Sequence, residues 1–348
     1  MTKTDIASFL PEELAEFLSD LSEKSGVKIE KFRAKQIFSW LAKGVTSFDE
    51  MTNVSAAIRK VLDEHTYIST PKIHTKLVSQ IDGTVKYLFE LADGERVESV
   101  FMRYEHGNTV CISTQAGCRM GCTFCASTLN GLTRNLTASE MAGQIIAAQN
   151  DTGERVSNVV MMGIGEPLDN YDNTLQFLRL INHKDHLCIG HGHISLSTCG
   201  LCNKIRSLAD ENLQITLSVS LHAPDSETRK KLMPVARKFE LEELIDSCKY
   251  YIEKTGRRIS FEYSMIHGEN DTPLHAKKLA GLLSGMLCHV NLIPLNTVKE
   301  RSYVKSSKEA IAEFVKILEK AHLTATVRRR LGSDINASCG QLRKSSEE

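Results

Sequence analysis

Apolar positions in the first seventy residues recur with the period of an α-helix. The segments LPEELAEFLSDL, FRAKQIFSWLAKG and SAAIRKVLDEH repeat apolar residues at roughly helical spacing, among them Phe32, Ile37, Phe38 and Leu41 in the second segment. Each such helix has one apolar face, which needs a partner to cover it. The pattern predicts a small helical bundle over residues 1–70.

From residue 72 onward the period changes to that of β-strands. The segments KIHTKLVSQ, VKYLFEL, RVESVFM and TVCIS alternate apolar and polar residues, and Asp82-Gly83 and Asp93-Gly94 separate the first three. Asp-Gly pairs favour the tight turns of β-hairpins. The pattern predicts an antiparallel β-hairpin extension over residues 71–110.

Beyond residue 115, short runs rich in β-branched residues alternate with amphipathic helical stretches. The runs are NVVMMG, HISLST, ITLSVSLHA, ISFEYSMI, HVNLIPLN and TATVRRR. Such alternation is typical of βα units around a parallel sheet, and with a strand near TVCIS it gives about six or seven units, short of the eight of a closed barrel. We expect an α/β fold, a partial (β/α)6 TIM-like barrel over residues 111–340 with a tail at 341–348. In such folds the chemistry gathers at the C-terminal ends of the strands.

Composition excludes some classes of protein but does not identify a function. The 348 residues are 41% hydrophobic, and 43 basic and 43 acidic residues give a formal net charge of zero. Disordered, collagen-like and small disulfide-rich proteins are excluded, and no global charge attracts nucleic acid or an anionic membrane. The charged N-terminal segment has no signal-peptide core, and the uncharged stretch 279–298 predicts a helix and a buried strand rather than a membrane span. We expect a cytoplasmic location.

Three of the ten cysteines are grouped in a way that indicates a metal centre. Cys118, Cys122 and Cys125 form a CxxxCxxC motif directly after the TVCIS strand. Three thiolates can hold one side of a metal centre and leave one coordination position open for a small molecule. Structural zinc usually recruits a further pair of cysteines or histidines nearby in the chain, and none follows close to the motif here. The spacing favours an iron–sulfur cluster, with zinc as the alternative.

Small and polar residues occupy the predicted strand ends. In GIGEPL, Gly165 allows close approach of a ligand to the backbone and Glu166 can accept hydrogen bonds from an amino group. Ser197, Ser220 and Asn296 end later runs, where a lone Ser or Asn more often caps the next helix. Thr137 and Glu140 have the spacing of a helix capping box.

A tenth cysteine lies near the C-terminus. Cys339 stands in SCGQL among small residues, a setting that suits an exposed mobile loop, with a buried inert thiol as the alternative.

Taken together, the motifs resemble those of the RlmN/Cfr family of radical S-adenosylmethionine RNA adenine methyltransferases, and the RlmN branch most closely. In chain order they are VESVFM, VCISTQAGC, RNLTASE, GIGEPLDNYDN, SLSTCG, SVSLHAP, LMPV, NDTPLHA, LIPLN and GSDINASCGQL, and the resemblance runs from FRAKQIFSWL to Cys339. Pro167 looks like RlmN, whereas Cfr-type sequences tend to carry Ala. Ile164 and Ser338 replace the Met and Ala of the family pattern, and neither is a ligand.

The resemblance implies roles for individual residues. One 4Fe-4S cluster would be held by Cys118, Cys122 and Cys125. S-adenosylmethionine, two molecules per turnover, would be bound by Gly165, Glu166, Ser197, Ser220, Leu221, His222 and Asn296. The covalent chemistry would use Cys339 as the S-methylcysteine intermediate, Cys111 as the resolving cysteine and Glu98 as the proton acceptor. Glu98 could instead hydrogen-bond the adenine amino group. The remaining cysteines would be structural: Cys188, Cys199, Cys202, Cys248 and Cys288.

The implied mechanism is covalent because carbon 2 of adenine is electron-poor and cannot attack a sulfonium methyl group. One S-adenosylmethionine would methylate Cys339, and a second, held on the cluster, would give a deoxyadenosyl radical that takes a hydrogen from the S-methyl group. The methylene radical would add to carbon 2, and Cys111 would release the RNA by forming a disulfide with Cys339.

The implied substrates are an adenosine in the peptidyl-transferase centre of 23S rRNA and the adenosine 3′ of the anticodon in tRNA. Cfr-type methylation of carbon 8 is the first alternative, and a non-catalytic zinc-binding RNA-interaction protein is the second. An electron donor such as flavodoxin or ferredoxin would be needed, no membrane partner is expected, and we expect a monomer.

Local clusters of basic residues could contact RNA despite the zero net charge, although each alone is more often a solvated face. One set surrounds the later strands: Lys299, Arg301, Lys305, Lys308, Arg328, Arg329, Arg330, Arg343 and Lys344. A second set lies in the N-terminal helices, which resemble the family's RNA-contacting accessory domain: Lys31, Arg33, Lys35 and Lys43.

Overall fold

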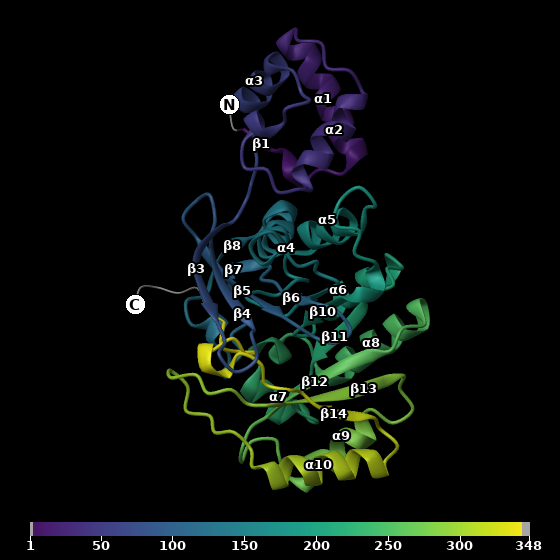
Figure 1. The fold of residues 1–348 in the computed structure, drawn as a ribbon. Helices are drawn as coiled ribbons and strands as arrows, with labels where there is room; N and C mark the ends of the chain where they lie inside the picture. Colours follow the sequence, from purple (N-terminus) through teal and green to yellow (C-terminus); the bar gives the residue numbers. More distant parts are fainter. Residues whose placement is uncertain (1–2, 343–348) are drawn as a thin grey trace.

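A ten-stranded mixed sheet runs through the computed structural model, which describes residues 3–342 (Figure 1). Its spatial order is β14-β13-β12-β11-β10-β9-β6-β5-β4-β3. The consecutive strands from β6 to β14 in this order pair in parallel. They are β6 (Thr109–Cys111), β9 (Asn158–Met161), β10 (Ile194–Thr198), β11 (Thr216–Ser220), β12 (Ile259–Met265), β13 (Cys288–Pro294) and β14 (Ala325–Val327).

Helices connect the parallel strands, because a parallel pair needs a crossover that returns the chain to the same end of the sheet. They are α4 (Ala138–Thr152), α5 (Tyr171–Asn182), α6 (Cys202–Asp210), α7 (Ser226–Leu232), α8 (Leu241–Thr255), α9 (Pro273–Leu282) and α10 (Lys308–Lys320). The predicted α/β architecture is therefore confirmed. The uncharged stretch 279–298 is the end of α9 followed by β13, as predicted, and no helix among residues 3–342 is long and apolar enough to cross a membrane.

The predicted hairpins form, and they continue the same sheet. The strands β3 (Lys72–Val78), β4 (Val85–Glu90) and β5 (Arg96–Met102) pair antiparallel, and β5 then pairs with β6. The alternation in β4 is visible as buried and half-buried positions. In β3 the alternation has no such effect, because this edge strand is exposed along its whole length.

The N-terminal residues form the expected helical unit, purple in Figure 1: α1 (Pro11–Ser25), α2 (Phe32–Leu41) and α3 (Ala56–His65). A parallel pair of short strands, β1 (Thr4–Asp5) and β2 (Thr66–Tyr67), brings its two ends together. Three of the four apolar residues singled out in α2 are buried, whereas Phe32, its first residue, is 56% exposed. The boundaries proposed for this domain remain a prediction.

One small sheet was not foreseen. The strands β7 (Gln115–Gly117) and β8 (Leu132–Asn135) pair antiparallel outside the main sheet. The CxxxCxxC motif therefore does not follow β6 directly, as the sequence suggested. It lies in the loop that β7 and β8 close.

Candidate active site

The three motif cysteines line one cavity. Cys118, Cys122 and Cys125 lie between β7 and β8, and they face a cavity of about 150 Å³. The loop is closed at its base, where the backbone N–H of Cys118 donates to the carbonyl of Gly131 at 2.8 Å. All ten cysteines of the chain are free thiols.

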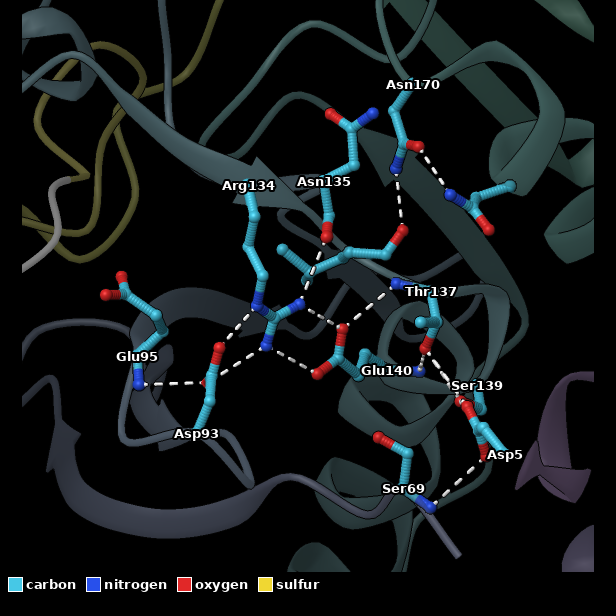
Figure 2. Close-up of polar contacts among 12 residues, drawn as sticks. Asp5, Ser69, Asp93, Glu95, Arg134, Asn135, Thr137, Ser139, Glu140 and Asn170 are labelled. Atoms are coloured by element: carbon cyan, nitrogen blue, oxygen red, sulfur yellow. Dashed lines mark hydrogen bonds and ion pairs between the residues drawn. The ribbon is translucent and has the colours of Figure 1, made fainter. Parts of the chain in front are cut away.

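Charged side chains fix the far end of this loop (Figure 2). Arg134 on β8 forms ion pairs with Asp93 in the β4–β5 turn at 2.5 Å and with Glu140 in α4 at 2.7 Å. Glu140 also completes the predicted capping box, because its carboxylate accepts the N–H of Thr137 at 3.0 Å while the Thr137 hydroxyl accepts the N–H of Glu140 at 3.2 Å. The cysteine loop is thereby tied both to the hairpin extension and to the start of α4.

Burial favours the protonated form of these thiols unless a metal cation binds them. It raises the pKa of Cys118 to about 12 and raises the pKa values of Cys122 and Cys125 above their ordinary value, and the neighbouring thiolate charges add to the rise in Cys122. If all three lose their protons, the thiolates would need a cation such as a metal centre as counter-charge.

The donor set fits a cluster better than a zinc ion. No three His, Cys, Asp or Glu side chains within residues 3–342 are arranged to hold a single metal ion. A single tetrahedral zinc needs its ligands to converge on one point, whereas in a four-iron cluster each thiolate binds a different iron. The three cysteines that line the cavity could each bind a different iron of such a cluster.

Residues at the ends of successive strands line the same cavity. Of the seven expected to bind S-adenosylmethionine, six face it: Gly165, Glu166, Ser197, Ser220, His222 and Asn296. Leu221 is fully buried and does not line the cavity, and its backbone N–H donates to the carbonyl of Glu262 at 3.0 Å.

The turn after β9 presents a fixed carboxylate. Gly165 has φ +108°, and a Cβ there would lie 2.7 Å from Cβ of Gln115, so the close approach requires glycine. The Glu166 carboxylate accepts the backbone N–H of Cys199 at 2.7 Å and that of Leu168 at 3.0 Å. Burial raises the pKa of Glu166, and these two bonds oppose the rise. Cys199, which we expected to be purely structural, itself lines the cavity.

His222 is held as a neutral ring. Its Nδ1 accepts the backbone N–H of Ser264 at 2.9 Å, so the proton is on Nε2. Phe124 packs against it edge to face, with ring centroids 4.9 Å apart. Burial lowers the pKa of His222 to about 3. The residue therefore contributes a donor and no charge to the cavity.

The C-terminal loop brings Cys339 to the cavity that the three motif cysteines line. The Asn296 amide donates to the carbonyl of Cys339 at 3.0 Å, and the N–H of Ala126, next to Cys125, donates to the carbonyl of Gly340 at 2.8 Å. The loop continues inward, because Gln341 donates to the carbonyl of Thr297 at 3.0 Å. Part of the predicted tail is thus packed, whereas Arg343 and Lys344 lie outside the described residues.

Cys111 lies in the apolar layer on which this loop packs. The layer is formed by Val100, Met102, Cys111, Ile164, Ala337 and Leu342. Burial raises the pKa of Cys111 to about 12, and the charge of a Cys339 thiolate adds to the rise. Cys111 and Glu98 are not among the residues that face the cavity.

Two arginines expected at an RNA-binding rim have internal partners. Arg328 lines the cavity together with Cys339, and its guanidinium lies 3.8 Å from the Glu262 carboxylate. Arg301 donates to the Thr128 hydroxyl at 3.2 Å, against the cysteine loop.

Known proteins share both parts of this architecture. The model of the radical SAM superfamily matches residues 112–279, and that of the ribosomal RNA large subunit methyltransferase N-terminal domain matches residues 4–68. A radical SAM methyltransferase structure from Sphaerobacter thermophilus covers 98% of this chain and all of its own, with a TM-score of 0.92 and 40% identity.

Curated relatives extend the match over nearly the whole chain. A probable dual-specificity RNA methyltransferase RlmN from Alkaliphilus oremlandii is 57% identical over 344 residues, which cover 99% of this chain and 98% of that protein. One of the same description from Clostridium tetani is 55% identical over 91% of each chain. With Cys339 and the three motif cysteines on one cavity, the chain belongs to the RlmN family of the radical SAM superfamily.

Proposed function

We propose that this protein is a dual-specificity RNA methyltransferase that adds a methyl group to carbon 2 of an adenosine in the peptidyl-transferase centre of 23S rRNA and of the adenosine 3′ of the anticodon in tRNA. One observation carries the proposal furthest: Cys339 faces the same cavity as Cys118, Cys122 and Cys125. A thiol placed there can carry a methyl group beside the three cysteines that would hold the cluster. The relatives described as RlmN favour carbon 2 over the carbon 8 chemistry of Cfr.

The residues of this chain would hold the cofactors. A 4Fe-4S cluster and S-adenosylmethionine, when bound, supply an electron, a methyl group and a carbon radical. Cys118, Cys122 and Cys125 would ligate the cluster, and Glu166, fixed by two backbone N–H groups, would accept the amino group of S-adenosylmethionine. His222 would present its Nε2 proton as a neutral donor.

The chain's own groups would then move the proton and release the product. After the methylene carbon on Cys339 has bonded to carbon 2, the adduct would have to give up its unpaired electron, for which the cluster, when bound, would be the acceptor. Glu98 would take the proton from carbon 2. The Cys111 thiolate would attack Sγ of Cys339, so that a disulfide forms and the bond from Sγ to the methylene carbon breaks. The methylene carbon then takes a proton and becomes the methyl group. The contact of the Cys339 loop with the Cys111 layer supports this exchange.

The substrate base would have to leave its stack, because Cys339 faces a cavity inside the fold. This favours loops over regular duplex as substrates. We further infer an electron donor such as flavodoxin or ferredoxin and a monomeric enzyme.

The product identifies the reaction. The anaerobically reconstituted protein is incubated with S-adenosylmethionine, a reductant and an rRNA fragment, and the RNA is digested for mass spectrometry. We expect 2-methyladenosine. Methylation at carbon 8, or an intact cluster without methylated RNA, would contradict the proposal.

The resolving role of Cys111 has its own test. Cys111→Ala should retain an RNA–protein adduct at Cys339 that a denaturing gel resolves, because the last bond cannot be broken. Cys288→Ala, at the start of β13 and not on the cavity, should turn over like the parent protein. Free turnover of Cys111→Ala would remove this role.

A further inference from the structure

Lys86 on β4 is a nearly buried cation beside the proposed proton acceptor. Its side chain is 11% exposed, and its Nζ lies 2.7 Å from Oε1 of Glu98, whose side chain is 6% exposed. Lysine is rarely buried unless it is paired. In the β4–β5 register Lys86 is opposite Val100, so Glu98 is its diagonal neighbour on the same face of the sheet.

The same ammonium also contacts the loop that carries Cys339. Nζ of Lys86 donates to the carbonyl oxygen of Asn336 at 3.3 Å, three residues before Cys339. Asn336 has φ +50°, so its carbonyl is set by an irregular, left-handed stretch of the loop. One side chain therefore joins Glu98 to the loop of the methyl acceptor.

The turn that precedes Lys86 binds the loop at further points. The Ser79 hydroxyl and the Gln80 N–H donate to the two carboxylate oxygens of Asp334, at 2.7 and 2.9 Å. The N–H of Gly332 donates to the Asp82 carboxylate at 2.9 Å. Figure 1 shows this last stretch of chain, in yellow, beside β3 and β4. We call residues 79–86 the loop dock.

From these contacts we propose that Lys86 is a positioning residue of the methyl transfer, which fixes the Glu98 carboxylate relative to the Cys339 loop. The inference rests on the proposed function, in which Glu98 accepts the proton of carbon 2. A base must lie within hydrogen-bond reach of the proton that it removes, and an error of one ångström can cost about a hundredfold in rate. Lys86 donates to both partners through one ammonium group.

The predicted defect belongs to one step. When the ammonium is lost, the methylene carbon still bonds to carbon 2, but proton removal is slowed. Radical formation continues, so 5′-deoxyadenosine is released without a matching methylated base and the RNA–protein adduct accumulates. If Lys86 had a merely structural role, its loss would lower the rates of all steps together.

The test uses the full-length, cluster-loaded enzyme and three variants. Lys86→Met removes the ammonium and keeps the stem, and Lys86→Arg keeps a cation that can donate to both partners. Lys76→Met is the matched control, because Lys76 on β3 pairs with Asp151 at 2.6 Å and is not part of the loop dock. Methylated adenosine per 5′-deoxyadenosine, the adduct fraction and the S-methylation of Cys339 are measured for each.

We expect Lys86→Met to lower the ratio of methylated adenosine to 5′-deoxyadenosine by about tenfold or more and to raise the adduct fraction. Lys86→Arg should recover most of the ratio, and Lys76→Met should match the parent. A parental ratio in Lys86→Met, or an equal loss of all products that Lys86→Arg does not recover, overturns the inference.

Two controls keep the result interpretable. If Lys86→Met does not fold, Asp334→Asn is used instead, because it weakens the contact between the loop dock and the Cys339 loop at an exposed side chain. This variant should also lower the ratio of methylated adenosine to 5′-deoxyadenosine. A parental ratio in Asp334→Asn overturns the inference. Absence of 2-methyladenosine with the parent enzyme contradicts the proposed function itself, and a parent that methylates carbon 2 leaves only the role of Lys86 under test.

Discussion

At the scale of single residues, burial and backbone hydrogen bonds decide which charges the cavity contains. Glu166 accepts two backbone N–H groups, and His222 accepts one and stays neutral. Arg328 faces Glu262 and lies near the Cys339 sulfur, whose charge raises the pKa of the guanidinium further. Each group is fixed by the fold before a ligand arrives, which lowers the reorganisation that binding requires.

His222 should make the protein sensitive to acid. Its pKa falls from 6.5 in the unfolded chain to about 3 in the folded protein, so below pH 6.5 only the unfolded chain takes up the proton. The free energy of unfolding should therefore fall with decreasing pH by up to about 1.4 kcal/mol per pH unit from this residue alone. His222→Asn, which tolerates the left-handed backbone at φ +54°, should flatten the slope in urea unfolding between pH 6.5 and 5. An unchanged slope would show that His222 titrates normally.

At the scale of elements, the cysteine loop depends on short strands that are held from outside. β7 and β8 have three and four residues, and strands this short are marginal by themselves. Arg134 supplies the missing support through Asp93 and Glu140. The hairpin extension therefore supports two loops of the site, that of the three cysteines and that of Cys339.

Arg134→Met should weaken both stability and cluster binding. Glu140 would lose the cation that pairs with a side chain only 5% exposed, and breaking such a buried pair costs about 3 kcal/mol. We expect that loss in urea unfolding and less iron per chain after reconstitution. Arg179→Ala removes an exposed pair with Glu211 and should cost under about 1 kcal/mol with normal iron content. Full iron content in Arg134→Met would contradict the support of the loop.

The sequence was informative about elements wherever a period extends over several turns or strand residues. α1 to α3, the hairpins and the parallel strands were predicted from such repeating patterns, although β3 is exposed and β12 is buried along its whole length. β7 and β8 were missed, because their sequences, QAG and LTRN, contain no run of apolar β-branched residues. The exposure of β3 and of Phe32 was also missed, since both lie at edges that only the assembled fold defines.

Within the site, the sequence indicated residues but not their partners. The cysteines, Glu166 and Asn296 were found from motifs, and the structure brings them to one cavity. The pairing of Lys86 with Glu98 depends on the register of two strands, and the place of Arg328 depends on how β14 ends against Glu262. Such pairings arise only when distant segments meet.

At the scale of the whole molecule, a half-buried carboxylate joins the N-terminal helical unit to the rest of the protein. Asp5 accepts hydrogen bonds from Ser139 and Thr137 at the start of α4 and from the N–H of Ser69 (Figure 2). Burial raises the pKa of Asp5 and these bonds oppose the rise. The carboxylate holds β1, the segment after β2 and α4 together.

Asp5→Ala should loosen the helical unit without disturbing the chemistry at Cys339. Hydrogen exchange should increase in residues 3–71, and the affinity for RNA should fall, while S-methylation of Cys339 by S-adenosylmethionine should match that of the parent. Asp20→Ala, an exposed substitution in α1, is the control and should leave both unchanged. Loss of Cys339 methylation in Asp5→Ala would show that the unit also shapes the active site.

The attachment of the Cys339 loop has a consequence for substrate choice. The loop is bound before Cys339 at Asn336 and after it at Gln341, and at Cys339 itself through Asn296. Because its loop is held on both sides, the Cys339 side chain can change its rotamer, but its backbone cannot move toward the RNA. The target adenosine must therefore move to Cys339. The free energy needed to unstack that adenosine from its RNA then contributes to the selectivity of the enzyme among RNA substrates.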